Sequence, residues 1–137
     1  MKLGRTMNPQ VLFVSPFTED AVRLTQMLRS LPIRLSHATN LQQAHAMLDA
    51  DRCRVILTEA DLPDGSWLDL LSLAQQAASG IEVIVTDAFA DARFWAEALN
   101  LGAYDLLVQP FHEAEVRRIL SNACTRMLPG QPALAAV

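Results

Sequence analysis

The sequence predicts an α/β domain in which a five-stranded parallel sheet is covered by helices on both faces. Short, wholly apolar segments such as Val11-Leu12-Phe13-Val14 are typical of strands that are buried on both sides. These segments alternate along the chain with longer ones whose apolar residues recur at helical spacing. Strands that alternate with helices through short connections require right-handed crossovers, and these make the sheet parallel.

Composition and charge narrow the class of protein. The chain has 137 residues, of which 51% are hydrophobic and 19% charged, as expected for one folded domain. A net charge of -4 disfavours nucleic acid as a direct partner. No apolar run reaches the roughly 20 residues that a membrane span needs, and residues 1–9 lack the apolar core of a signal peptide. We therefore expect a cytoplasmic protein without a membrane contact.

The two cysteines, Cys53 and Cys124, are far apart and lack metal-ligand spacing. Both lie among apolar residues. We expect buried free thiols in a reducing compartment rather than a disulfide.

The strands are predicted from apolar runs and from alternation. The segment 33–38 alternates between apolar and polar residues, which is typical of a half-exposed strand near an edge. The other runs are mainly apolar, with at most one charged residue near their start, and polar residues follow them. The predicted strands are 11–14, 33–38, 53–58, 81–86 and 104–108.

The helices are predicted from apolar spacing and from end signals. Thr18 and Asn40 are expected N-caps, Pro32 ends the first helix, and Gly80 and Gly102 follow the third and fourth. The predicted helices are 18–31, 41–50, 67–79, 91–101 and 113–127. We expect one domain over residues 10–127, with flexible ends at 1–9 and 128–137.

Polar residues stand where several strands end. The central stretch from Val55 to Gly65 passes from apolar residues into acids, with Glu59 nearest the strand. Ser15 follows the first strand, Thr86 and Asp87 end the fourth, and Gln109 follows the fifth. In open α/β sheets, ligands and chemistry lie outside the carboxyl ends of the strands. These side chains are therefore expected to converge on one pocket.

Two longer motifs give a family resemblance. They are Glu59-Ala60-Asp61-Leu62-Pro63-Asp64-Gly65 after the third strand and Gly102-Ala103-Tyr104-Asp105-Leu106-Leu107-Val108-Gln109-Pro110-Phe111 near the end. With them, residues 10–127 resemble the receiver domain of bacterial two-component response regulators. The resemblance implies a flavodoxin-like (βα)5 three-layer sandwich, strand order 2-1-3-4-5, and a role in phosphorelay signal transduction without an enzymatic output.

The family's phosphorylation site is degenerate at most positions of this chain. In the family, two acids after the first strand hold a divalent cation, and here Ser15 and Pro16 replace them. The phosphoacceptor aspartate is replaced by Glu59, and the lysine after the fifth strand by Gln109. Thr86 matches the family's hydroxyl residue. The position of the aromatic switch residue falls on Leu106.

These losses are electrostatically consistent with one another, because two carboxylates and the lysine are missing together. Glu59 is left as the main charge, which Thr86, Gln109 and backbone N–H groups can meet without a metal. The sequence thus favours a pseudo-receiver that acts by protein–protein contact and is not phosphorylated. As a partial phosphoaspartate mimic, Glu59 would direct a fixed negative charge toward Thr86.

Two alternatives remain open. Asp61, with Asp64 and Asp87, could rebuild a weak Mg²⁺ site and so a working phosphoacceptor, although solvated loop acids are the simpler interpretation. The pocket could instead bind a small molecule. No other cofactor is expected.

The expected partners are proteins, either a sensor kinase or an effector. In the family, the fourth helix, fifth strand and fifth helix form dimer and effector contacts, and here the same surface could form a homodimer or be only a solvated face of mixed charge. This surface carries polar residues and charges of both signs, at Arg93, Glu97, Asn100, Glu115, Arg117 and Arg118.

Overall fold

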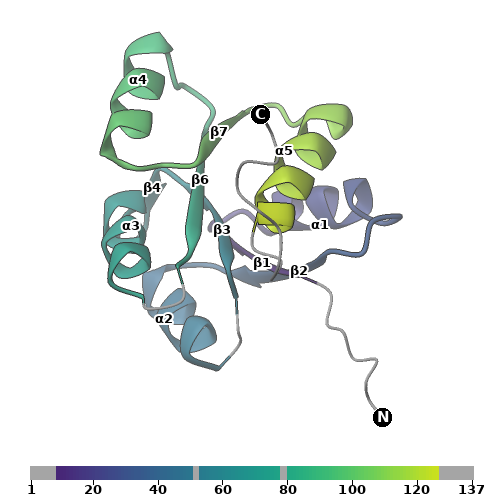
Figure 1. Ribbon diagram of the computed structural model, residues 1–137, viewed down its shortest axis with the longest axis horizontal. Helices are drawn as coiled ribbons and strands as arrows, with labels where there is room; N and C mark the ends of the chain where they lie inside the picture. The colour runs from purple at the N-terminus through teal and green to yellow at the C-terminus, as the bar shows by residue number, and fades with distance from the viewer. Residues whose placement is uncertain (1–8, 51–52, 78–79, 127–137) are drawn as a thin grey trace.

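The computed structural model describes residues 9–50, 53–77 and 80–126, built around a parallel sheet (Figure 1). The sheet has five strands in the order β2-β1-β3-β6-β7. Because β6 and β7 are its fourth and fifth strands in chain order, this confirms the predicted order 2-1-3-4-5. The strands are β1 Gln10–Val14, β2 Arg34–Ala38, β3 Val55–Glu59, β6 Glu82–Asp87 and β7 Asp105–Val108. The expected flexible ends lie almost wholly outside the described residues.

Helices cover both faces of this sheet, as the sequence predicts. One face packs against α1 and α5, and the other against α2, α3 and α4, which gives three layers (Figure 1). The helices are α1 Thr18–Met27, α2 Leu41–Ala50, α3 Trp67–Gln76, α4 Ala92–Leu101 and α5 Glu113–Arg126.

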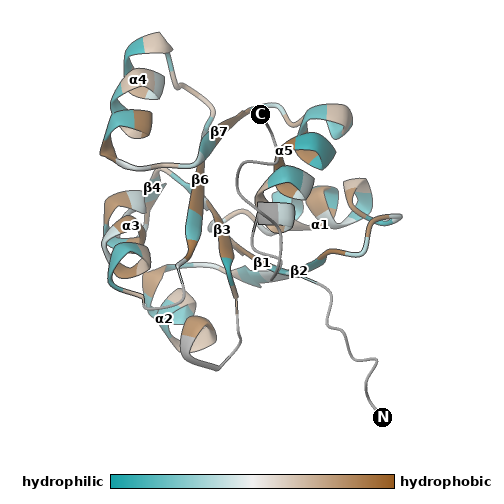
Figure 2. Ribbon diagram, viewed as in Figure 1, coloured by the Kyte–Doolittle hydropathy of each residue, from teal (hydrophilic) through white to brown (hydrophobic). Residues whose placement is uncertain are grey.

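The central strand β3 belongs to both halves of the core. All its residues are buried, and successive side chains point to opposite faces of the sheet. Ile56 packs in the cluster under α2, α3 and α4, whereas Val55 and Leu57 pack in the cluster under α1 and α5. In Figure 2 this strand is largely brown, the colour of apolar residues. Burial of each such side chain contributes about 1.5–3 kcal/mol to folding, so β3 is a rigid base for the residue that ends it.

The ends of α1 differ from the prediction. Phe17 is the N-cap residue and makes no side-chain cap, and Thr18 is already helical. The Ser15 hydroxyl accepts the Phe17 N–H at 3.0 Å, so a serine turn before the helix replaces the expected threonine cap. The helix ends at Met27 instead of Leu31, because residues 28–31 form turns ahead of Pro32.

The polar loop after β3 contains a short hairpin that the sequence analysis missed. β4 (Asp61–Leu62) pairs antiparallel with β5 (Gly65–Ser66). The Asp64 carboxylate accepts the N–H groups of Leu41 at 2.8 Å and Gln42 at 3.1 Å, which fixes the loop to the start of α2. Two-residue strands are too short to be predicted from periodicity.

Other helix ends agree with the sequence. The Asn40 side chain accepts the Gln43 N–H, as an N-cap does. Ser66 and Asp69 form a capping box on α3, and Asp91 caps α4. Gly102 ends α4 with a φ of 123°, a conformation that favours glycine.

Both cysteines are buried free thiols, as predicted. Burial raises the pKa of Cys124 to about 11, which keeps this thiol protonated and unreactive. Within the described part of the chain, no helix has the length and apolar character to cross a membrane.

Candidate functional site

The predicted convergence of strand ends is present in the structure. Glu59 is the last residue of β3 and lies directly opposite Thr86 of β6 in the parallel register. Gln109 follows β7, the next strand of the sheet, and Ser15 follows β1 on the other side of β3. The sheet order therefore brings these residues to one edge, because all four strands end there.

A single amide connects the buried side chains of Glu59 and Thr86. Gln109 Nε2 donates hydrogen bonds to Glu59 Oε2 and to Thr86 Oγ1, both at 3.0 Å. The Thr86 hydroxyl in turn donates to the Leu107 carbonyl oxygen at 2.7 Å. Thr86 is thus engaged as both acceptor and donor, and it meets Glu59 through Gln109 rather than directly. We call this arrangement the Glu59–Gln109–Thr86 chain.

Glu59 lies in an environment that opposes its negative charge. Only 8% of the residue is exposed, and burial raises its pKa to about 7, against the smaller opposing effect of the Gln109 hydrogen bond. The carboxylates of Asp20, Asp87 and Asp61 raise it further. No Lys or Arg nitrogen forms an ion pair with Glu59 among the described residues.

This finding corrects one expectation from the sequence. Glu59 was expected to carry a fixed negative charge, but a carboxyl with a pKa of about 7 is only half ionised at neutral pH. The sequence identifies the residue type and not the depth of its burial, and burial is the larger cause of the shift. As a mimic of phosphoaspartate, the side chain carries less than one charge.

The positions of the family's acid pair carry no carboxylate, as the sequence shows. Ser15 is fully buried, and its hydroxyl accepts the Phe17 N–H. Its carbonyl oxygen lies 2.8 Å from Nε2 of His37, which donates to it. The Ser15 hydroxyl oxygen therefore stabilises the turn before α1, and its carbonyl oxygen binds His37 of β2.

Asp20 is a site residue that the sequence analysis missed. It lies in the first turn of α1, where it was assigned only to the helix start. Its charge acts on Glu59, and its Oδ1 lies 3.5 Å from Arg23 Nη1 in an exposed ion pair. No sequence signal marks this contact, because it depends on where the β1–α1 turn places the first helical turn.

The loop acids have separate roles. Asp64 is bound to the N-terminus of α2. The hydrogen bond from the Leu41 N–H is the largest cause of its lowered pKa; desolvation opposes this effect, and the Gln42 N–H lowers the pKa by a smaller amount. Asp87 Oδ1 accepts the Phe89 N–H at 3.0 Å, and Asp61 is exposed in β4. Within residues 9–50, 53–77 and 80–126, no group of three or more His, Cys, Asp or Glu side chains is arranged to hold a metal ion.

Leu106 and Trp67 both lie in the core beside the site. Leu106 is 2% exposed and packs in the cluster under α2, α3 and α4. Trp67 is also buried. Its backbone N–H donates to the carbonyl oxygen of Ala60, the residue after Glu59. Its ring packs edge-on against Phe94 of α4, with 6.4 Å between the ring centroids. Trp67 therefore connects the strand exit to two helices.

Comparison with known proteins identifies the family. The response regulator receiver domain family matches residues 17–121, well over half of the chain. The transcriptional regulatory protein DpiA of Escherichia coli K12 is 33% identical over 98 residues, which are 67% of this chain and 43% of DpiA. The response regulator protein PilR of Pseudomonas aeruginosa is 31% identical over 86 residues, 63% of this chain and 19% of PilR. The chain thus spans less than half the length of these curated relatives.

Solved structures agree with this result. The signal receiver domain of an HD domain-containing protein from Pseudomonas fluorescens Pf-5 superposes with a TM-score of 0.77 and 26% identity, over 93% of this chain and 95% of that one. The receiver domain of the Francisella response regulator 1452 superposes with a TM-score of 0.79 and 21% identity, over 88% of this chain and 100% of that one. At this identity the likeness shows the fold alone. The chain belongs to the response regulator receiver family and is a receiver domain of two-component signalling.

Proposed function

We propose that this receiver domain is not phosphorylated at the family's acceptor position and acts through protein contacts whose state is set by the Glu59–Gln109–Thr86 chain. The observation that carries the proposal is the pair of hydrogen bonds from Gln109 to Glu59 and Thr86. They hold together the two side chains between which a phosphoryl group would have to enter.

The chemistry of the site supports this proposal. Attack by Glu59 on a phosphoryl donor needs an ionised carboxylate, and burial raises the pKa of this group to about 7. Charge that develops on the transferring group needs a cation, and Gln109 supplies only a neutral amide. Transfer to Glu59 would therefore be slow.

The residues at the family's Mg²⁺ site do not fit a hard divalent cation. Such ions prefer carboxylate and carbonyl oxygens, but Ser15 Oγ accepts a backbone N–H and Pro16 has no side-chain donor. Of the loop acids, Asp64 is already bound to the start of α2. The rival function, a working phosphoacceptor, would have to recruit Asp20, Asp61 or Asp87.

A surface on α4 supports contact with another protein. Large apolar side chains are exposed there, with Trp95 at 36% and Leu99 at 47% on adjacent turns of the helix, and Phe89 at 91% in the loop before it. We propose that α4, β7 and α5 form a homodimer or effector interface centred on this apolar strip. Arg117 does not belong to it, because its Nη1 donates to Met27 O and Ser30 Oγ at the end of α1.

Intact mass spectrometry after incubation with acetyl phosphate and Mg²⁺ tests the proposal. We expect no added phosphoryl on the wild-type chain. The matched control is a restored variant, Ser15→Asp, Pro16→Asp, Glu59→Asp and Gln109→Lys together, which should gain one phosphoryl group. A gain by the wild type that Asp61→Asn or Asp20→Asn abolishes would instead establish the rival function.

A further inference from the structure

The edge strand β2 has no partner on its outer side among the described residues, where it pairs with β1 only. Arg34 N–H donates to the Pro9 carbonyl oxygen and Ala38 O accepts from Ser15 N–H, both toward β1. Backbone groups of a parallel strand alternate in direction, so those of Leu35 and His37 point away from the sheet. Such an edge can accept a further strand.

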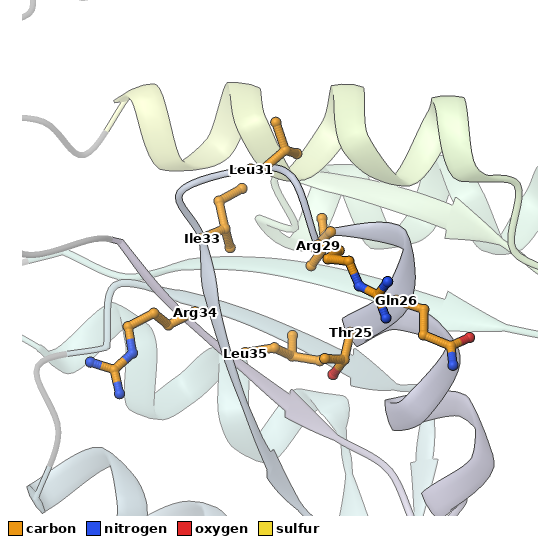
Figure 3. A pocket seen from close by; sticks show the side chains of 8 residues that line it. Thr25, Gln26, Arg29, Leu31, Ile33, Arg34 and Leu35 are labelled. Atoms are coloured by element: carbon orange, nitrogen blue, oxygen red, sulfur yellow. The ribbon is translucent and has the colours of Figure 1, made fainter.

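A hollow of about 390 Å³ lies beside this edge, between β2 and the end of α1 (Figure 3). Leu31, Ile33 and Leu35 supply apolar side chains to it, and all three pack against the core cluster under α1 and α5 while remaining partly exposed. Gln26 and Arg29 line it from the side of α1. The hollow therefore offers an apolar floor to a side chain from a strand laid along β2.

The charges around the hollow are positive, in a chain whose net charge is -4. The Arg34 side chain projects from β2 on the side opposite to that of Ile33, and the Arg29 side chain lies on the side of α1 (Figure 3). Neither guanidinium is in an ion pair with a described carboxylate. Arg117 approaches the same end of α1, where it donates to Met27 O and Ser30 Oγ, but it adds little to this charge because its Nη1 lies 3.9 Å from Glu113 Oε2.

From these features we propose that β2 and the α1–β2 hollow dock an extended segment of a partner protein that alternates apolar and acidic residues. Added as a strand outside β2, such a segment bonds to the backbone of Leu35 and His37. Its apolar side chains enter the hollow on one face, and its carboxylates meet Arg34 on the other, because side chains alternate across a strand.

A second copy of this chain fits the edge less well than an acidic segment. Pairing β2 with its own copy would bring a second Arg34 to the edge and no carboxylate to meet either one, because the strand Arg34–Ala38 contains no acid. The site is also separate from the Glu59–Gln109–Thr86 chain, because Arg34 opens β2 whereas the polar site lies at the carboxyl ends of the strands. Its test is therefore independent of phosphorylation.

The test uses the full ¹⁵N-labelled chain and a capped peptide of about seven alternating Glu and Val residues, enough for one strand. We expect saturable NMR shifts at the amides of Leu35 and His37 and around residues 25–33. Arg34→Glu should weaken binding at least about fivefold, equivalent to about 1 kcal/mol, and should bind a Lys–Val peptide better than the wild type does. Arg93→Glu on α4 is the matched control and should leave binding unchanged.

Four results would overturn the proposal. The first is the absence of shifts at millimolar peptide, and the second is shifts confined to β7, the opposite edge of the sheet. The third is equal binding of a peptide whose alternate backbone nitrogens are methylated, since strand addition needs those N–H groups. The fourth is a dimer of the free chain that Arg34→Glu dissociates and Trp95→Glu does not, which would assign the edge to a second copy.

Discussion

Raising the pH from 5 to 8 should destabilise this protein through the carboxyl group of Glu59. The folded state holds the proton of this group up to a pKa of about 7, whereas the unfolded chain releases it near 4.5. Between these values the folded state binds more protons, so the free energy of unfolding falls as the pH rises. The stabilisation is complete below about pH 4.5 and is lost as the pH passes through about 7.

The magnitude follows from the width of this window. Each pH unit over which the two states differ by one proton changes the free energy by about 1.4 kcal/mol, so the interval from 4.5 to about 7 corresponds to about 3.5 kcal/mol. The site lies at the end of the sheet, where solvent screens part of the charge, and we expect about 2 kcal/mol. Asp64 has a lowered pKa, so its stabilising contribution is lost only at lower pH, outside this interval.

Urea unfolding followed by circular dichroism, at half-unit steps between pH 5 and 8, measures the effect. Glu59→Gln is the matched variant, because its amide oxygen can still accept the Gln109 hydrogen bond but has no proton to release. Between pH 5 and 8, the free energy of unfolding should fall by about 2 kcal/mol less in Glu59→Gln than in the wild type. Equal slopes in the two proteins would show that Glu59 does not hold its proton in the folded state over this interval.

Three further perturbations test other parts of the structure. Gln109→Lys should place an ammonium against Glu59, lower its pKa below 7 and flatten the same pH dependence; an unchanged midpoint in a carboxyl NMR titration would show that the amide does not contact Glu59. Asp64→Ala should lower the melting temperature, because two N–H groups at the start of α2 lose their acceptor, whereas Asp64→Asn should restore part of the loss. Leu57→Ala should cost about 2–5 kcal/mol in chemical unfolding, because the residue is fully buried in β3, and a cost below 1 kcal/mol would contradict its assignment to the core.

Much of the fold could be predicted from the sequence because its signals are local. Apolar runs gave the strands of the sheet, and the Asn40 and Gly102 positions gave two helix ends correctly. The helix α1 begins at Thr18 as predicted, but the expected Thr18 cap was wrong, since Ser15 and Thr18 are both good turn residues and only the folded turn decides between them. The β4–β5 hairpin was missed, because strands of only two residues show no periodic pattern in the sequence.

The candidate site could be predicted in position and only partly in chemistry. Strand ends and sheet order were enough to bring Glu59, Thr86 and Gln109 together. The ionisation of Glu59 could not be predicted, since it depends on burial and on the approach of Asp20 from another element. The role of Asp64 was also hidden, because its partners at the start of α2 lie 23 and 22 residues away in the chain.

The protonation state of Glu59 is tested most directly by a ¹³C NMR titration of its side-chain carboxyl, in the presence and in the absence of Mg²⁺. We expect a midpoint near 7 that Mg²⁺ does not move, because the buried carboxyl is held by the Gln109 amide and forms no ion pair with a cation of the described residues. A midpoint near the ordinary value of 4.5, or a midpoint that falls when Mg²⁺ is added, would contradict this expectation. The fall on adding Mg²⁺ would show that Asp20, Asp61 or Asp87 rebuilds a cation site around Glu59.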